Sequence, residues 1–98
     1  MKFMDLAYEI YLEALRDKVN PITFSVAKFL YALTFSIASI KEKISVIEIG
    51  TGYGFSTLWI AKAIKDAGTK GTIITIESAR KRAERAIINL EKAGLKDI

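Results

Sequence analysis

The chain has 98 residues, of which 51% are hydrophobic and 27% charged, a composition typical of one small ordered domain rather than a disordered tail. It contains no cysteine and no histidine, which excludes disulfides, thiolate or imidazole metal ligands and a cysteine nucleophile. The net charge is +4, but the basic residues are spread along the chain, so we expect solvated helix faces rather than a nucleic-acid surface.

The first predicted element is an amphipathic helix over residues 3–19. Its apolar face, at helical spacing, contains Phe3, Leu6, Ala7, Ile10, Ala14 and Leu15. We expect Asn20 and Pro21 to end this helix, because the residue before a proline avoids the helical conformation. Asp5 and Glu9 interrupt the apolar character that a signal peptide would need.

A second helix is predicted over residues 23–40, with Thr23 or Ser25 as its N-terminal cap. It is apolar on most sides and therefore needs partners around much of its circumference. Its length raises the question of a membrane span, but Lys28 and several hydroxyl residues favour a buried or interface helix. We therefore expect a cytoplasmic protein with no membrane contact.

The rest of the chain predicts two units of strand followed by helix. Residues 44–49 and 72–77 are rich in β-branched side chains and almost entirely apolar, as in a parallel sheet that is covered on both faces. Helices over residues 56–67 and 80–93 should end at Gly68 and Gly94. Their expected core positions are Leu58, Trp59, Ile60, Ala63, Ile64, Ala83, Ala86, Ile87, Leu90 and Ala93.

The basic run of the last helix, Arg80 to Arg82 with Arg85, is expected on a solvated face. The element order predicts an α/β fold with one right-handed βαβ crossover and a parallel strand pair. We expect a single domain, with a helical part over residues 1–43 and a βαβα part over residues 44–98.

The most informative stretch is a glycine loop between the first strand and the next helix, formed by Gly50, Gly52 and Gly54. The first glycine allows a sharp turn, and the others remove side chains where the backbone would approach a ligand. Unpaired amides at the start of the helix face the same space. A dinucleotide loop has the spacing G-x-G-x-x-G, and Phe55 at the third position disfavours a nicotinamide cofactor.

Two glutamates accompany this loop. Glu77 ends the second strand, roughly twenty residues beyond the loop, the spacing at which an acidic side chain accepts hydrogen bonds from ribose hydroxyls. Glu48 lies just before the turn. Its carboxylate could hold the loop amides or meet the ammonium group of a ligand, and the sequence leaves both roles open.

Residues 46–58 resemble motif I of the class I S-adenosylmethionine-dependent methyltransferases, most closely the O-methyltransferases of the catechol and caffeoyl-CoA type. The resemblance covers residues 25–98. It extends through residues 26–30 and 74–77, and through Ala83, Ala86, Asn89, Leu90, Ala93, Gly94, Leu95 and Asp97. It implies a Rossmann-like methyltransferase half-fold: two N-terminal helices followed by βαβα.

The resemblance also implies the cofactor, S-adenosylmethionine, and the residues that bind it. Gly50, Thr51 and Gly52 would line its methionine and ribose part, with Glu48 near the methionine end and Gly54 in the same loop. Ser56 would bind its carboxylate, Glu77 its ribose hydroxyls, and Ser78 would lie beside its adenine. Tyr53 would line the pocket or pack in the core.

The family's sheet continues beyond two strands, so we expect this sequence to lack the catalytic residue, the metal-binding acids and the substrate walls. Three functions remain open. The chain is the S-adenosylmethionine-binding portion of a methyltransferase that uses a small-molecule acceptor when complete, a nucleotide-binding half-domain of an oxidoreductase, or a catalytically inactive oligomerisation protein. The open edge of the first strand and the apolar helix 23–40 predict a homo-oligomer.

Overall fold

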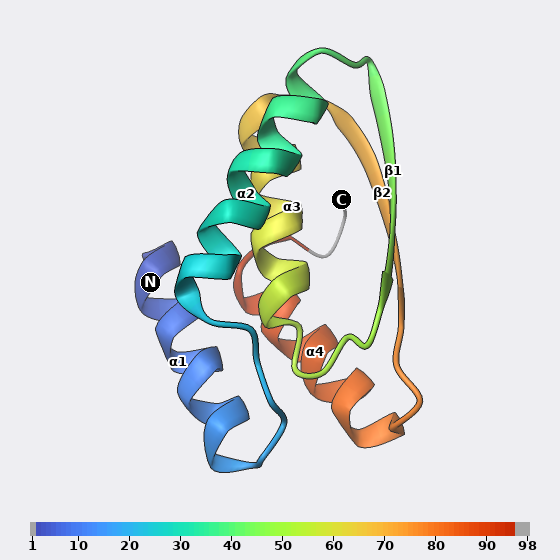
Figure 1. Ribbon diagram of the computed structural model, residues 1–98. Coiled ribbons are helices and arrows are strands. Elements are labelled where there is room, and N and C mark those ends of the chain that lie inside the picture. Colours follow the sequence, from blue (N-terminus) through green and yellow to red (C-terminus); the bar gives the residue numbers. More distant parts are fainter. Residues whose placement is uncertain (1, 96–98) are drawn as a thin grey trace.

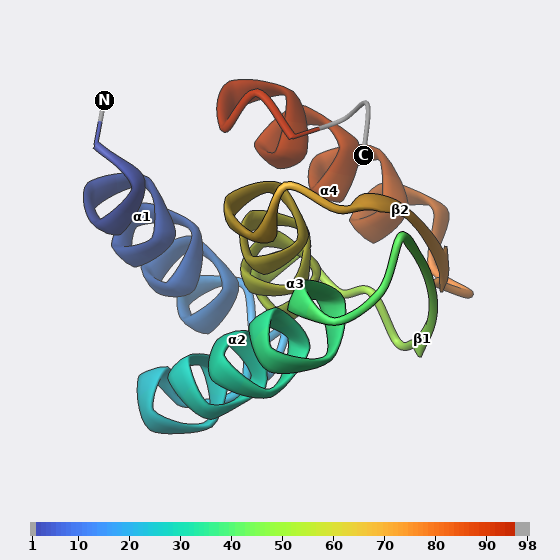
Figure 2. The same ribbon diagram turned by 90° about the horizontal axis from the view of Figure 1, so that it is seen from above.

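The computed structural model describes residues 2–95 and confirms the predicted α/β order. Its elements are α1 (Phe3–Arg16), α2 (Phe24–Ser39), β1 (Lys43–Ile49), α3 (Phe55–Ala67), β2 (Lys70–Ile76) and α4 (Arg80–Lys92). The strands pair in parallel, from Lys43 opposite Lys70 to Ile49 opposite Ile76. All the helices of this part of the chain lie on one side of the strand pair, with α3 in the middle of their layer (Figures 1 and 2).

Helix α1 ends three residues before the predicted end, which was placed at Val19. Lys18 adopts a left-handed backbone with φ of 58°, and the Val19 amide donates to the Ala14 carbonyl at 2.8 Å. This pair of features is a helix-ending turn that satisfies the last carbonyls of α1. The helix therefore stops before the proline can affect it.

Helix α2 begins where the sequence predicted, because Thr23 caps it: the Val26 amide donates to Thr23 Oγ1 at 3.2 Å. Only part of its apolar surface is covered. Ala27, Thr34 and Ala38 are buried, whereas Phe29 is 68% exposed. Within residues 2–95, no helix combines the length and apolar character needed to cross a membrane.

The main core lies between α1, α2 and α3, and all five core positions predicted for α3 are buried. Aromatic rings pack edge to face within it, with ring centroids 5.2 Å apart for Phe24 and Phe55 and 5.0 Å apart for Phe3 and Trp59. Two core predictions were wrong, since Leu15 and Ile87 are each 48% exposed.

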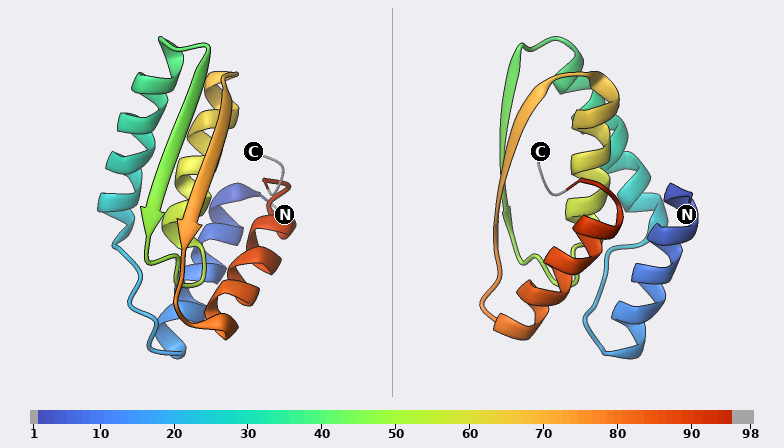
Figure 3. Two further views of the ribbon diagram at one scale, coloured as in Figure 1. Left: turned by 90° about the vertical axis from the view of Figure 1, so that its right-hand side faces the viewer. Right: turned by 180° about the vertical axis from the view of Figure 1, so that it is seen from behind.

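The strand pair is covered on one face, so the expectation of a sheet covered on both faces is wrong for residues 2–95 (Figure 3). Alternate residues such as Val46 and Ile73 point toward the helices and are partly buried. The residues between them point away from the helices, and Ile47 and Ile49 are 70% and 84% exposed. The outer face of the sheet is consequently open, and it is apolar over the C-terminal half of both strands.

Candidate functional site

Both strands end at the same edge of the sheet, beside the glycine loop, the end of α1 and the start of α4 (Figures 1 and 3). Gly50 and Gly54 each have φ of 87°, a left-handed backbone that favours glycine. A Cβ built on Gly50 would meet nothing within 4 Å, whereas one on Gly54 would lie 3.3 Å from Ala86 Cβ. Gly50 therefore leaves room for a ligand, and Gly54 allows α4 to approach the loop.

The Glu77 carboxylate is fixed beside this loop by backbone amides. Its Oε2 accepts from the Ala79 amide at 3.0 Å, and its Oε1 accepts from the Gly52 amide at 2.7 Å. These two hydrogen bonds hold the pKa of Glu77 below its usual value, because they stabilise the charged form. Each oxygen keeps a second lone pair that could accept a ligand hydroxyl.

The Glu48 carboxylate accepts from hydroxyl groups rather than from loop amides. Ser56 Oγ donates to it at 2.5 Å and Thr75 Oγ1 at 2.8 Å, and the Thr57 hydroxyl donates as well. The Thr75 hydroxyl also pairs with that of Thr51. Glu48 thus joins β1 to β2 and to the first turn of α3. Ser56 would have to change its partner to bind a cofactor carboxylate.

A cavity of about 80 Å³ lies between the glycine loop and the linker that follows α1. Of the predicted site residues, its lining includes Gly50, Thr51, Gly52, Tyr53 and Ser56. The first-turn amides of α3, at residues 55–57, have no acceptor within the helix. The loop edge therefore offers amide donors for an anionic group.

The other predicted site residues lie outside this cavity. Glu77 lines a second one of about 210 Å³ between the end of β2 and the apolar face of α4, and Thr51 borders both. Ser78 is exposed just beyond Glu77. Their roles toward a cofactor stay predictions.

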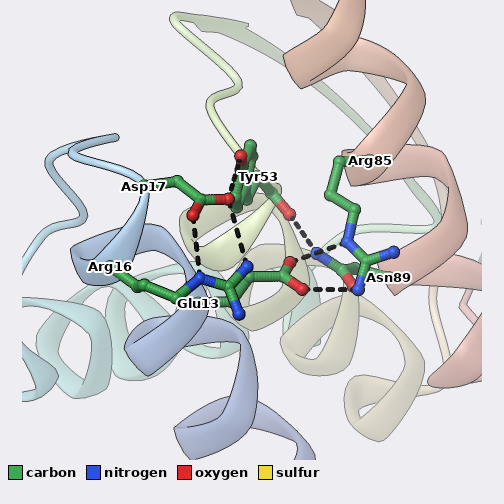
Figure 4. A network of polar contacts seen from close by, with 6 residues as sticks. All are labelled: Glu13, Arg16, Asp17, Tyr53, Arg85 and Asn89. Carbon is green, nitrogen blue, oxygen red and sulfur yellow. Dashed lines mark hydrogen bonds and ion pairs between the residues drawn. The ribbon is translucent and has the colours of Figure 1, made fainter.

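Sequence reasoning missed a polar network that connects α1, the loop and α4 (Figure 4). It joins Glu13, Arg16, Asp17, Tyr53, Arg85 and Asn89. Arg85 was expected on a solvated face, which is wrong: its guanidinium bonds to Glu13 of α1, whose side chain is only 16% exposed. A polar residue among the apolar positions of α4, Asn89, was the signal that could have revealed this network.

Within residues 2–95, the site contains amide donors, two carboxylates and several hydroxyls, and the hydroxyls of Ser56 and Thr57 both donate to Glu48. In the same range, no group of three or more carboxylates is placed to hold a metal ion.

Comparison with known proteins identifies the family. Residues 47–98 match the family described as "Methyltransferase domain". A catechol O-methyltransferase of Mycobacterium tuberculosis is 43% identical over 70 residues, covering 71% of this chain and 29% of that protein. A protein-L-isoaspartate O-methyltransferase of Pyrococcus horikoshii is 35% identical over 72 residues, covering 74% of this chain and 30% of that protein.

The fold agrees with the sequence matches. The solved O-methyltransferase of Bacillus cereus in complex with SAH (S-adenosylhomocysteine) superposes with a TM-score of 0.70 at 27% identity, covering 95% of this chain and 40% of that chain. The chain thus spans 29% and 30% of the length of the two curated relatives named above. The matched region contains the glycine loop, β2 and Glu77, and the chain belongs to the methyltransferase domain family.

Proposed function

We propose that this chain is the S-adenosylmethionine-binding portion of an O-methyltransferase that acts on a small-molecule acceptor. One observation carries the proposal: the Glu77 carboxylate is held by the Gly52 amide at the strand ends, beside the open space in front of Gly50. An adenosine ribose needs such an acceptor for its two hydroxyls. The solved relative from Bacillus cereus is in complex with SAH, which is consistent with this ligand.

In this proposal the chain binds and orients the cofactor. The sulfonium of S-adenosylmethionine supplies the reactive methyl group when it is bound. The backbone of residues 50–52 and the first-turn amides of α3 would hold the amino-acid end of the cofactor, and Ser56 would contribute its hydroxyl. Glu77 would fix the ribose and so set the direction in which the methyl group points. We further propose that residues 1–98 belong to a single domain, with the helical part and the βαβα part folding together.

Two features favour this ligand over a dinucleotide. Phe55 occupies the third glycine position of a dinucleotide loop and is 3% exposed, so its ring belongs to the core. Gly54, which has no counterpart in that pattern, packs against α4 instead of facing a pyrophosphate. For the acceptor, the identity to the catechol enzyme exceeds that to the isoaspartate enzyme, 43% against 35%, which favours a small molecule.

Calorimetric titration with S-adenosylmethionine and S-adenosylhomocysteine tests the proposal. We expect saturable binding by the wild-type chain and a loss of about 10- to 100-fold in affinity for Glu77→Gln, since hydrogen bonds to a charged acceptor are replaced by weaker ones. Glu84→Gln, on the exposed side of α4, is the matched control and should bind as the wild type does. A folded wild-type chain that binds neither ligand would contradict the proposal and favour a non-catalytic role.

We also propose that the chain self-associates through the open edge of β1 and the exposed apolar face of α2. A groove of about 450 Å³ runs between them, and its lining combines apolar residues, among them Leu33, Ile37 and Val46, with Lys41 and Lys43. The accessible surface is 6268 Å², against about 5,600 Å² for a compact chain of 10.9 kDa. The excess of roughly 700 Å² approaches the area that one partner contributes to a standard interface.

Light scattering during size-exclusion chromatography measures this assembly. We expect a dimer at micromolar concentration, and a shift to monomer in Ile47→Lys, which places a charge on the 70% exposed side chain beside the open edge. Glu42→Lys, in the polar turn before β1, is the control for added positive charge. A wild-type chain that stays monomeric would refute self-association.

A further inference from the structure

The end of α1 and the linker after it form one wall of the cavity beside the glycine loop. Ala14, Val19 and Pro21 line this wall, opposite the loop residues. Val19 also packs directly on the loop, because a Cβ built on Gly52 would lie 3.3 Å from Val19 Cγ1. The position of this wall therefore determines how much of the loop a ligand can reach.

Two polar contacts fasten the wall to the rest of the molecule (Figure 4). The Tyr53 hydroxyl donates to Asp17 Oδ2 at 2.6 Å, and Arg85 Nε donates to Glu13 Oε1 at 2.7 Å. Glu13 is four residues before Asp17, so the two carboxylates lie at the same end of α1 about one turn apart. Both contacts therefore hold the C-terminal end of α1 in place.

Helix α4 provides the fixed side of these contacts. The Asn89 side-chain amide donates to the Tyr53 carbonyl at 2.9 Å, and Asn89 is 2% exposed. Asn89 and Arg85 are about one turn apart on α4. Tyr53 is therefore held by α4 at its carbonyl and by α1 at its hydroxyl. The first half of α1 is anchored separately in the core by Leu6 and Ile10.

The space behind the wall is small. A cavity of about 80 Å³ has room for about three water molecules, whereas sites for ligands of nucleoside size are typically about 300 to 1,000 Å³. A ligand that places an amino-acid group against the loop amides therefore has to pass the wall, which must move aside as the ligand enters and leaves. Because the first half of α1 is anchored in the core, the movement is expected at its last turn and the linker.

We propose that the last turn of α1 and residues 17–22 form a gate on the cofactor cavity, held closed by the Asp17–Tyr53 and Glu13–Arg85 contacts. This inference rests on the proposed function, since it concerns exchange of that cofactor. Asp17 and Arg85 are positioning residues that act through the wall. Weakening either contact opens the gate more often, so the ligand enters and leaves faster while its affinity changes little.

The first measurement needs no ligand. Hydrogen exchange of the Val19 amide, which donates to Ala14 in the closed wall, reports opening by NMR. We expect exchange to be about three- to tenfold faster in Asp17→Ala and in Tyr53→Phe, the range for one partly exposed charge-assisted hydrogen bond. The double variant should be no faster than the faster single one, since both lose the same bond.

The second measurement is stopped-flow binding of S-adenosylhomocysteine. In Asp17→Ala, whose side chain lies outside the cavity lining, the association and dissociation rate constants should rise together, with the equilibrium constant within about twofold of wild type. Glu13→Arg should also accelerate exchange, and adding Arg85→Glu should restore it by rebuilding the ion pair with the charges reversed.

Tyr31→Phe is the matched control, because it removes a similar tyrosine–aspartate bond, from Tyr31 to Asp66, between α2 and α3. Two results would overturn the gate. In the first, the Val19 amide exchanges in Asp17→Ala and Tyr53→Phe as slowly as in the wild type. In the second, Tyr31→Phe accelerates its exchange as much as they do. Failure of the wild-type chain to bind S-adenosylhomocysteine would instead refute the proposed function, and the exchange measurement would still decide whether the wall opens.

Discussion

Gly50 and Gly54 have the same backbone conformation, with φ of 87°, but different surroundings. Gly50 faces open space, and Gly54 touches Ala86 of α4. The glycine spacing in the sequence predicts the loop but assigns both residues to the ligand. Which glycine faces the ligand and which faces a helix depends on where α4 packs, and this position is set by contacts distant in the sequence.

Gly54→Ala should destabilise the chain more than a left-handed conformation alone explains. The conformation costs an alanine about 1 to 2 kcal/mol. The contact with Ala86, whose Cβ and Cα would lie 3.3 and 3.4 Å away, adds roughly another 1 kcal/mol or more, since a helix backbone moves little. Urea unfolding measures the sum of these two losses in the free energy of unfolding.

Gly68→Ala provides the comparison for this substitution. Gly68 has φ of 71°, and an added Cβ would meet nothing within 4 Å, so only the conformational cost should appear. Equal losses in the two variants would show that α4 tolerates a side chain on the loop.

At the same scale, the sequence predicted Glu77 and the glycines but not the partners of Glu48. One βαβ unit fixes the number of residues between the loop and Glu77, so the position of Glu77 can be predicted from the sequence. The hydroxyls that surround Glu48 come from β2 and α3, with Thr75 at a separation of 27 residues. Only the parallel register brings Thr75 to Glu48, and the sequence does not specify that register residue by residue.

Among the elements, α1 and α4 are joined by the ion pair between Glu13 and Arg85. The hydrogen bond from Arg85 is the main cause that lowers the pKa of Glu13 below its ordinary value of 4.5. A carboxyl group with a lowered folded-state pKa adds stability above its unfolded pKa and loses it as the pH falls through the folded value. The ion pair between Glu13 and Arg85 should therefore lose its contribution to stability only at acidic pH.

Urea unfolding of wild type and Glu13→Gln at pH 7, 4 and 3 tests this dependence. The difference in free energy of unfolding should be largest at pH 7 and should shrink below about pH 4.5, where Glu13 of the unfolded chain begins to bind a proton while the folded chain keeps it charged. Glu9→Gln, on the exposed side of the same helix, should follow the wild type throughout. A difference that stays constant down to pH 3 would exclude the ion pair as its source.

The type of each element could be predicted from the periodicity of its apolar residues. Which residues of each element are buried was harder to predict. Every helix and strand of residues 2–95 was expected, and capping chemistry located Thr23 and Gly68 correctly. Leu15 and Ile87 have the right spacing for the core but are each 48% exposed, and Ile87 lines the cavity beside Glu77 instead. A repeat of apolar residues identifies a face of the helix, whereas the packing of neighbouring elements decides how wide the buried part of that face becomes.

At the scale of the whole molecule, the sheet has apolar residues on both faces and helices on one. The apolar sequences of the strands predicted cover on both faces, whereas the helices of residues 2–95 cover one. Ile47, Ile49, Ile74 and Ile76 remain 55–84% exposed as a result. An exposed apolar surface of this kind favours a covering partner, and it adjoins the β1 edge through which self-association is proposed above.

The wall of the cavity and the loop that it faces have different relations to the family. The family match starts at residue 47 and includes the loop, Arg85 and Asn89, whereas Glu13, Asp17 and the linker precede it. The ligand-binding motif thus lies inside the family match, and the wall that faces it is built from residues that precede the match. In the gate proposed above, substitutions at Glu13 or Asp17 would change the residence time of the ligand and leave the motif itself unaltered.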